Sequence, residues 1–207
     1  MKIGIIGSGY IGETAARLFI KAGHEVALSN SRGPESLKDK VRELGPQARA
    51  TSVEDAAAFG EVVLVAVPLK AYEQLPRAQL SGKIVIDAMN YYPQRDGEID
   101  FQGKSTSEFV ARHLPGTRVV KAFNTMWFKT LGQDCKPGTP LEERLVLFLA
   151  GDDAGAKQTV SQLIEQIGFA PVDTGSLAVG GKRQQPGSAV YNRPMRPAQA
   201  REVLATL

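Results

Sequence analysis

The chain has 207 residues, of which 43% are hydrophobic and 23% charged, and its formal net charge is +3. This composition is ordinary for a globular protein with one sizeable core. Cys135 is the only cysteine, which excludes an intrachain disulfide and a cysteine-rich metal site. The chain lacks an apolar run of about 18 residues, a secretory leader and an aromatic-interleaved basic motif. We therefore expect a cytoplasmic protein that binds neither membrane nor nucleic acid.

Strand and helix patterns alternate along almost the whole chain. Continuous apolar runs at residues 3–6 and 62–67 are typical of parallel strands buried on both faces. Apolar residues at helical spacing over 10–22 predict a helix that ends at Gly23. By the same criteria we expect strands at 25–28, 48–50, 83–87, 117–122, 145–150 and 170–173, helices at 34–44, 53–59, within 69–80, 106–113, 154–167 and 197–207, and loops at 88–104 and 129–142.

This order predicts an α/β fold of the Rossmann type, a doubly wound, mostly parallel sheet with a short C-terminal loop-plus-helix extension. We place the main domain at residues 1–176 and the extension at 177–207. In such a sheet the ligand lies beyond the carboxyl ends of the strands, where the strand order reverses. The segments 7–12, 29–32, 67–69, 88–91 and 123–127 should therefore share one rim.

The first of these segments, Gly7-Ser8-Gly9-Tyr10-Ile11-Gly12, is a dinucleotide-binding fingerprint placed between a strand and a helix, as that motif requires. Gly7 permits the tight turn, and Gly9 lets the backbone approach a pyrophosphate. Gly12 lets the helix lie close to the sheet, with its first N–H groups facing the phosphates.

The segment Ser29-Asn30-Ser31-Arg32 indicates which dinucleotide is bound. An NAD site places an acidic residue here for the ribose 2′-hydroxyl. This chain offers two hydroxyls, an amide and a guanidinium, and a guanidinium can bind a phosphate monoester through two hydrogen bonds. The alternative is that Arg32 is a solvated residue of the turn before Gly33-Pro34. We predict an NADP site.

Other strand exits supply candidates for the rest of the cofactor and for a second substrate. Pro68 either stiffens the rim beside the ribose or merely ends its strand. Asn90 and Asn124 could each bond a ribose hydroxyl or the nicotinamide amide, or could cap their own turns. Met126 and Trp127 could form one wall of a site for a flat second substrate, or could belong to the core.

Acid–base candidates are few. His24 lies in a helix-to-strand turn on the opposite rim and His113 ends a helix, so we expect both to be structural. No metal-ligand spacing and no Ser-His-Asp constellation is visible. Reduction of an ordinary ketone needs a proton donor beside the carbonyl, whereas hydride exchange between two redox rings needs mainly face-to-face placement. The scarcity of acid–base residues therefore favours hydride exchange between two redox rings.

Five blocks of this sequence occur together, in this order, in one family: residues 7–12, 29–34, 86–92, 121–125 and 151–153. Over residues 1–176 the chain resembles the deazaflavin-dependent (coenzyme F420) NADP oxidoreductases, and it is similar to the cytosolic reductase part of the six-transmembrane metalloreductases. The resemblance implies the following contacts: Ser8, Gly9, Tyr10, Ile11 and Gly12 with the pyrophosphate, Ser29, Ser31 and Arg32 with the 2′-phosphate, and Val67, Pro68, Asn90 and Ala122 with the ribose and nicotinamide.

The resemblance also implies a deazaflavin over the nicotinamide, framed by the C-terminal segment, although residues 180–195 depart from the deazaflavin enzymes. We therefore expect an NADP(H)-dependent oxidoreductase that passes hydride between NADPH and a flat redox cofactor, a deazaflavin or a flavin. The alternatives are an NADPH-dependent reductase of a small carbonyl or imine, and a non-catalytic NADPH-binding module that senses redox state.

The closing helix offers Ala198, Val203, Leu204 and Leu207 for burial, and a short terminal helix is marginal alone. It should pack against its own sheet or against a second subunit, and a homodimer is the assembly that we expect.

Overall fold

All eight expected strands pair into one sheet, in the order β3-β2-β1-β4-β5-β6-β7-β8. The computed structural model describes all 207 residues. Neighbouring strands from β3 to β6 are parallel, whereas β7 is antiparallel to β6 and parallel to β8. The expected doubly wound, mostly parallel α/β fold is thus confirmed. The strands are β1 (Lys2–Ile6), β2 (Glu25–Ser29), β3 (Ala48–Ala50), β4 (Val62–Val65), β5 (Ile84–Asp87), β6 (Arg118–Ala122), β7 (Val146–Gly151) and β8 (Ala170–Asp173).

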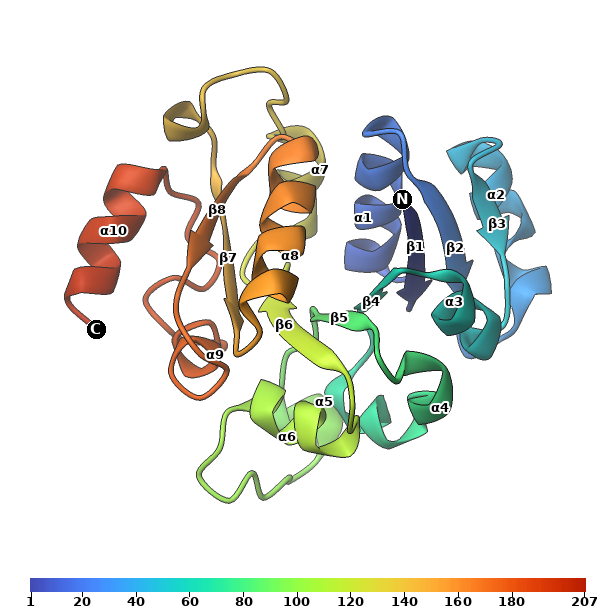
Figure 1. Cartoon of the computed structure of the whole chain (residues 1–207), viewed down its shortest axis with the longest axis horizontal. Coiled ribbons are helices and arrows are strands. Elements are labelled where there is room, and N and C mark those ends of the chain that lie inside the picture. Colours follow the sequence, from blue (N-terminus) through green and yellow to red (C-terminus); the bar gives the residue numbers. More distant parts are fainter.

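Helices connect the strands and cover the sheet, and α10 lies at the opposite end of the molecule from α2 (Figure 1). The longer ones are α1 (Tyr10–Lys21), α2 (Lys38–Leu44), α3 (Val53–Phe59), α6 (Thr106–His113), α8 (Ala154–Gln166) and α10 (Pro197–Ala205). Short helical turns are α4 (Arg77–Leu80), α5 (Pro93–Asp96), α7 (Phe128–Gln133) and α9 (Gly180–Arg183), with 3-10 turns η1 (Pro34–Leu37), η2 (Leu69–Gln74) and η3 (Leu141–Glu143).

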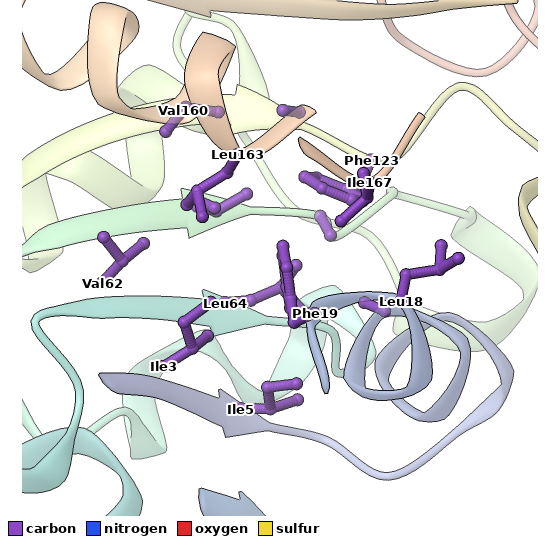
Figure 2. Close-up of a cluster of buried hydrophobic side chains, with 14 of the residues drawn as sticks. Ile3, Ile5, Leu18, Phe19, Val62, Leu64, Phe123, Val160, Leu163 and Ile167 are labelled. Atoms are coloured by element: carbon purple, nitrogen blue, oxygen red, sulfur yellow. The ribbon is translucent and has the colours of Figure 1, made fainter. Parts of the chain in front are cut away.

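The central strands are buried at almost every position because both faces of the sheet are covered. Ile3 and Ile5 of β1 and Leu64 of β4 belong to the larger core cluster, to which α1 and α8 contribute side chains. Figure 2 shows Phe19 of α1 in the middle of this cluster, and its ring lies 5.8 Å from that of Phe123, centroid to centroid. Alternate residues of the same strands face the second cluster, under α3, α4 and α6 (Ile6, Val63, Val65, Val85 and Val119).

Two segments expected to be loops contain short helices. The segment 88–104 includes α5, and the segment 129–142 includes most of α7 and most of η3. In α7 the expectation was wrong because tertiary packing overrides a weak local pattern. Leu131 is fully buried, and the Phe128 ring stacks on Tyr10 of α1 at 4.3 Å between centroids. The segment 177–196, also expected to lack structure, includes α9.

The C-terminal extension folds back onto its own sheet. Val190, Met195 and Ala200 form a third apolar cluster with Val146 and Phe148 of β7. Ala200 is buried where we expected Ala198, and Val203 and Leu204 pack against the same cluster. Helix α10 therefore buries its apolar side without a second subunit. The homodimer and the boundary at residue 176 stay predictions.

None of the helices is both long and apolar enough to cross a membrane. His24 is buried at the amino ends of the strands, where its Nε2 lies 2.9 Å from Oε1 of Gln166 in α8. His113 ends α6 against Tyr72, with ring centroids 5.1 Å apart. Both histidines thus take part in packing.

Candidate functional site

A cleft of about 380 Å³ lies beyond the carboxyl ends of β1, β4, β5 and β6, at the switch point of the sheet. Four of the five segments expected on this rim line it, and the segment 29–32 does not. The lining residues from those four segments are Gly9, Tyr10, Ile11, Val67, Pro68, Ala88, Asn90, Asn124, Met126 and Trp127. Ala122, also expected near the nicotinamide, is buried in β6 and does not line the cleft.

The three fingerprint glycines are needed for different reasons. Gly7 has a φ of +110°, and a Cβ there would lie 2.3 Å from the carbonyl oxygen of Ala66. A Cβ on Gly12 would lie 1.8 Å from the carbonyl oxygen of Gly7, so the start of α1 can approach β1 only without a side chain. A Cβ on Gly9 would meet nothing within 4 Å. Packing leaves the space beside Gly9 open, and this fits a pyrophosphate resting on the backbone at the start of α1.

The loop after β2 is organised by Asn30. Its Oδ1 accepts from the backbone N–H of Arg32 at 2.9 Å, and its Nδ2 donates to Ser8 at 3.1 Å and to Ser36 at 3.0 Å. Asn30 therefore ties the fingerprint turn to the loop that carries Ser31 and Arg32, both exposed. The role expected for Ser29 needs correction. Its hydroxyl is fully buried and donates to the carbonyl of Ile5 at 2.9 Å, so it does not reach a ligand.

Asn90 and Asn124 bond each other across the ends of β5 and β6. Asn90 Nδ2 donates to the backbone carbonyl of Asn124 at 2.8 Å, and Asn124 Nδ2 donates to Asn90 Oδ1 at 3.1 Å. Asn124 Nδ2 also donates to the carbonyl of Gln184 in the extension at 2.7 Å. Asn124 Oδ1 is buried without a partner in a residue that lines the cleft. It is a free acceptor, suited to the N–H groups of a carboxamide.

A buried ion pair holds the strand ends that carry these amides. Lys121 of β6 lies 3.2 Å from Asp87 of β5 and also donates to the carbonyl of Met89. Asp87 accepts from Ser107 of α6 at 2.7 Å and from the N–H of Met89 at 3.0 Å. Burial lowers the pKa of Lys121 below its ordinary value, and the neighbouring Asp87 carboxylate offsets part of this shift. Sequence reasoning missed this pair, although Lys121 interrupts an otherwise apolar strand.

Phe123 makes the turn that delivers Asn124 to the cleft. Its φ is +65°, a conformation that side chains other than glycine adopt at a cost of about 1 kcal/mol or more. The ring is fully buried against Phe19, and this packing holds the backbone in place. The block Lys121–Thr125 thus combines an anchor, a buried turn and a cleft-facing amide.

One wall of the cleft is aromatic and open to solvent. Trp127 is 52% exposed and Tyr10 is 72% exposed, and Phe128 lies between them. Trp127 is therefore not a core residue, which decides between the two readings of its sequence position. Met126, by contrast, is 6% exposed and belongs to the larger core cluster while it also lines the cleft.

The lining of the cleft also contains residues that we did not single out from the sequence. Tyr92 and Arg95 follow β5, and Tyr191 and Asn192 come from the extension. The backbone N–H of Asn192 donates to the carbonyl of Thr125 at 2.8 Å, which holds this part of the extension at the rim. Tyr92 lies two residues after Asn90 in the chain and could have been suspected. No local pattern marks Tyr191, because only the folded chain brings it here.

A cleft at the switch point of a doubly wound sheet, opened by a glycine turn, is the arrangement of dinucleotide-binding Rossmann proteins. Comparison with known proteins narrows that class. Residues 2–91 match the family described as NADP oxidoreductase, coenzyme F420-dependent. The expected resemblance to NADP-dependent oxidoreductases is thereby confirmed.

Two solved structures resemble the whole chain. The protein SMa0349 of Sinorhizobium meliloti is 36% identical, with a TM-score of 0.84 over 95% of both chains. A candidate F420-dependent NADP reductase of Arthrobacter sp. FB24 is 25% identical, with a TM-score of 0.75 over 94% of this chain and 99% of that one.

Rat metalloreductase STEAP3 is 33% identical over 181 residues, which are 86% of this chain and 34% of the rat protein. The chain thus spans about a third of the length of the curated relatives it matches.

Proposed function

We propose that this protein binds NADPH in the cleft and catalyses hydride transfer between its nicotinamide and a flat redox ring, a deazaflavin or a flavin. When bound, NADPH supplies the hydride. The observation that carries the proposal is the lining of the cleft, which combines exposed aromatic side chains with Asn90 and Asn124 at the strand ends. A flat conjugated ring can lie against such a wall above the nicotinamide.

The residues present suit the parts of NADPH. The first N–H groups of α1, beside the open space at Gly9, suit the pyrophosphate. The exposed guanidinium of Arg32 and the hydroxyl of Ser31 suit the 2′-phosphate. Val67 and Pro68 line the cleft where the ribose would lie, and the free Oδ1 of Asn124 suits the nicotinamide amide.

A reductase of a small carbonyl or imine is the second candidate, and the tyrosine hydroxyls on the cleft wall are the observation that favours it. A non-catalytic redox-sensing module is the third. Turnover separates the sensor from the two enzymes. A sensor would bind NADPH but would not oxidise it, whichever acceptor is supplied.

Purified protein should bind NADPH and oxidise it in the presence of FMN, FAD or coenzyme F420, as followed by nicotinamide absorbance. A variant that combines Arg32→Ala with Gly9→Ala should lose this activity with all three acceptors. Oxidation of NADPH by a panel of ketones and imines, but by none of the ring acceptors, would contradict the proposal in favour of the second candidate.

A further inference from the structure

Two tyrosine hydroxyls meet at the wall of the cleft. Tyr92 follows β5, Tyr191 belongs to the C-terminal extension, and their Oη atoms share a hydrogen bond. Both residues line the cleft together with Asn90 and Asn124. Since 99 positions of sequence separate the two phenols, only the folded extension creates the pair.

A hydrogen bond between two phenols uses one O–H as donor and leaves the other free to donate elsewhere. Either hydroxyl can be the donor of this bond, and the arrangement considered is the one in which Tyr191 donates to Tyr92. The O–H of Tyr92 is then the free donor of the pair. Donation by Tyr191 also polarises that O–H, since chained hydrogen bonds strengthen one another.

Arg95 adds positive charge beside Tyr92. Its guanidinium lies 5.0 Å from the centre of the Tyr92 ring and lines the cleft. Asp96, whose side chain is fully buried and does not line the cleft, pairs with Arg95 at 2.8 Å and accepts from the N–H of Tyr92 at 2.9 Å. The positive end of this ion pair therefore faces the cleft. Arg95 also donates to the carbonyl of Asn90 at 2.6 Å, which fixes the loop to the strand ends.

We propose that Tyr92, polarised by Tyr191 and flanked by Arg95, donates its O–H to the atom of the acceptor that gains negative charge when the hydride arrives. The inference rests on the proposed function and specifies its second substrate. The acceptor must carry an oxygen or nitrogen conjugated with the carbon or nitrogen that takes the hydride. Isoalloxazine and deazaflavin rings have this feature, and so do quinones.

The electrons balance without a proton leaving the protein. The C–H bond of the reduced nicotinamide breaks, its electron pair and hydrogen form the new bond on the acceptor, and one unit of negative charge appears at the conjugated atom. Tyr92 holds that charge by a hydrogen bond, and water can supply a proton after the product leaves. Because the wall stabilises negative charge on the ring, it also stabilises the transition state in which that charge develops.

The test compares the affinity of the full-length protein for oxidised and reduced FMN, the probe, under anaerobic conditions. Emission of Trp127, the only tryptophan, reports binding at the cleft. The preference for reduced FMN should fall about 10- to 100-fold in Tyr92→Phe, since a hydrogen bond to a charged group is lost. Tyr191→Phe should show a smaller fall, about tenfold or less, because its hydroxyl acts through Tyr92.

In turnover, Tyr92→Phe should lower kcat for FMN reduction and leave the Kd for NADPH unchanged. Tyr72→Phe is the matched control, because its hydroxyl donates to Glu73 outside the cleft, and it should match the wild type. If Tyr92→Phe keeps the wild-type preference for reduced FMN, the inference is wrong while the proposed function stands. If the wild type binds NADPH but reduces neither FMN nor coenzyme F420, the proposed function itself fails and the inference fails with it.

Discussion

The proposed phosphate end of the site, residues 7–12 and 29–32, and the proposed acceptor end in the cleft are built in different ways. The phosphate end consists of backbone turns and exposed side chains, with Gly9 open and Arg32 in solvent. The acceptor end consists of polar side chains fixed by contacts between distant segments, such as Lys121 with Asp87 and Tyr92 with Tyr191. A ligand made of phosphates can be held by main-chain groups of one short motif. A ring that changes charge needs donors aimed from several directions.

The largest expected effect comes from removing the ion pair that supports the acceptor end. Lys121→Met should cost about 3–5 kcal/mol of stability in urea unfolding, because it leaves the Asp87 carboxylate buried and unpaired. Lys121→Met combined with Asp87→Asn should recover part of that loss, since the second change removes the orphaned charge. Simple addition of the two single losses would show that the charges are not coupled.

The next test breaks the phosphate end through its backbone. Gly12→Ala should destabilise the protein by about 3 kcal/mol, because the new Cβ meets the Gly7 carbonyl at 1.8 Å. Gly9→Ala should fold with nearly wild-type stability and bind NADPH about 10- to 100-fold more weakly. Thermal unfolding and calorimetric titration measure the two effects. If Gly9→Ala binds NADPH normally, the pyrophosphate does not lie beside Gly9.

Arg32→Ala sharpens the same comparison, because an exposed residue should affect affinity and not stability. It should cost about 1.5–3 kcal/mol of NADPH binding, roughly 10- to 100-fold, with little change for NADH. Arg42→Ala is the control, since Arg42 is an exposed residue of α2 paired with Asp39. Equal weakening for NADPH and NADH would remove Arg32 from the 2′-phosphate site.

The smallest effect concerns neither end of the cleft. Burial lowers the pKa of His24 below its ordinary value of 6.5, so the unfolded chain binds the proton more readily than the folded one. Stability is therefore complete above pH 6.5 and falls as the pH drops below it, by at most about 1.4 kcal/mol per pH unit.

His24→Asn should flatten this slope in urea titrations between neutral and mildly acidic pH. His113→Asn should remove only the part of this pH dependence that comes from His113, whose pKa is also lowered by burial. An unchanged slope in His24→Asn would show that His24 does not resist protonation in the folded state.

The sequence predicts the glycine turn between β1 and α1 well because its determinants are adjacent. The apolar run of β1, three glycines and the start of α1 define one turn, and the strand exits follow from the alternation of elements. The errors have physical causes. Ser29 lies at the end of β2 and alternates inward, toward the carbonyl of Ile5, which its residue type does not reveal. Helix α7 forms because Leu131 and Phe128 find partners on the core and on α1.

The tyrosine pair was beyond prediction for a further reason. A search for acids and bases that looks for histidine passes over phenols, and nothing near Tyr191 in the chain suggests a ligand. Its position depends on the path of the extension after β8, which strand and helix patterns do not determine.

The reversal of β7 has an evolutionary consequence. Since β7 and β8 end at the far rim, the chain must travel back before it can reach the cleft, and its last thirty or so residues do so without pairing into the sheet. That returning segment supplies part of the proposed acceptor end of the cleft and none of the residues of the glycine fingerprint. Descendants could exchange the segment to serve a new electron acceptor while the nucleotide half stays untouched.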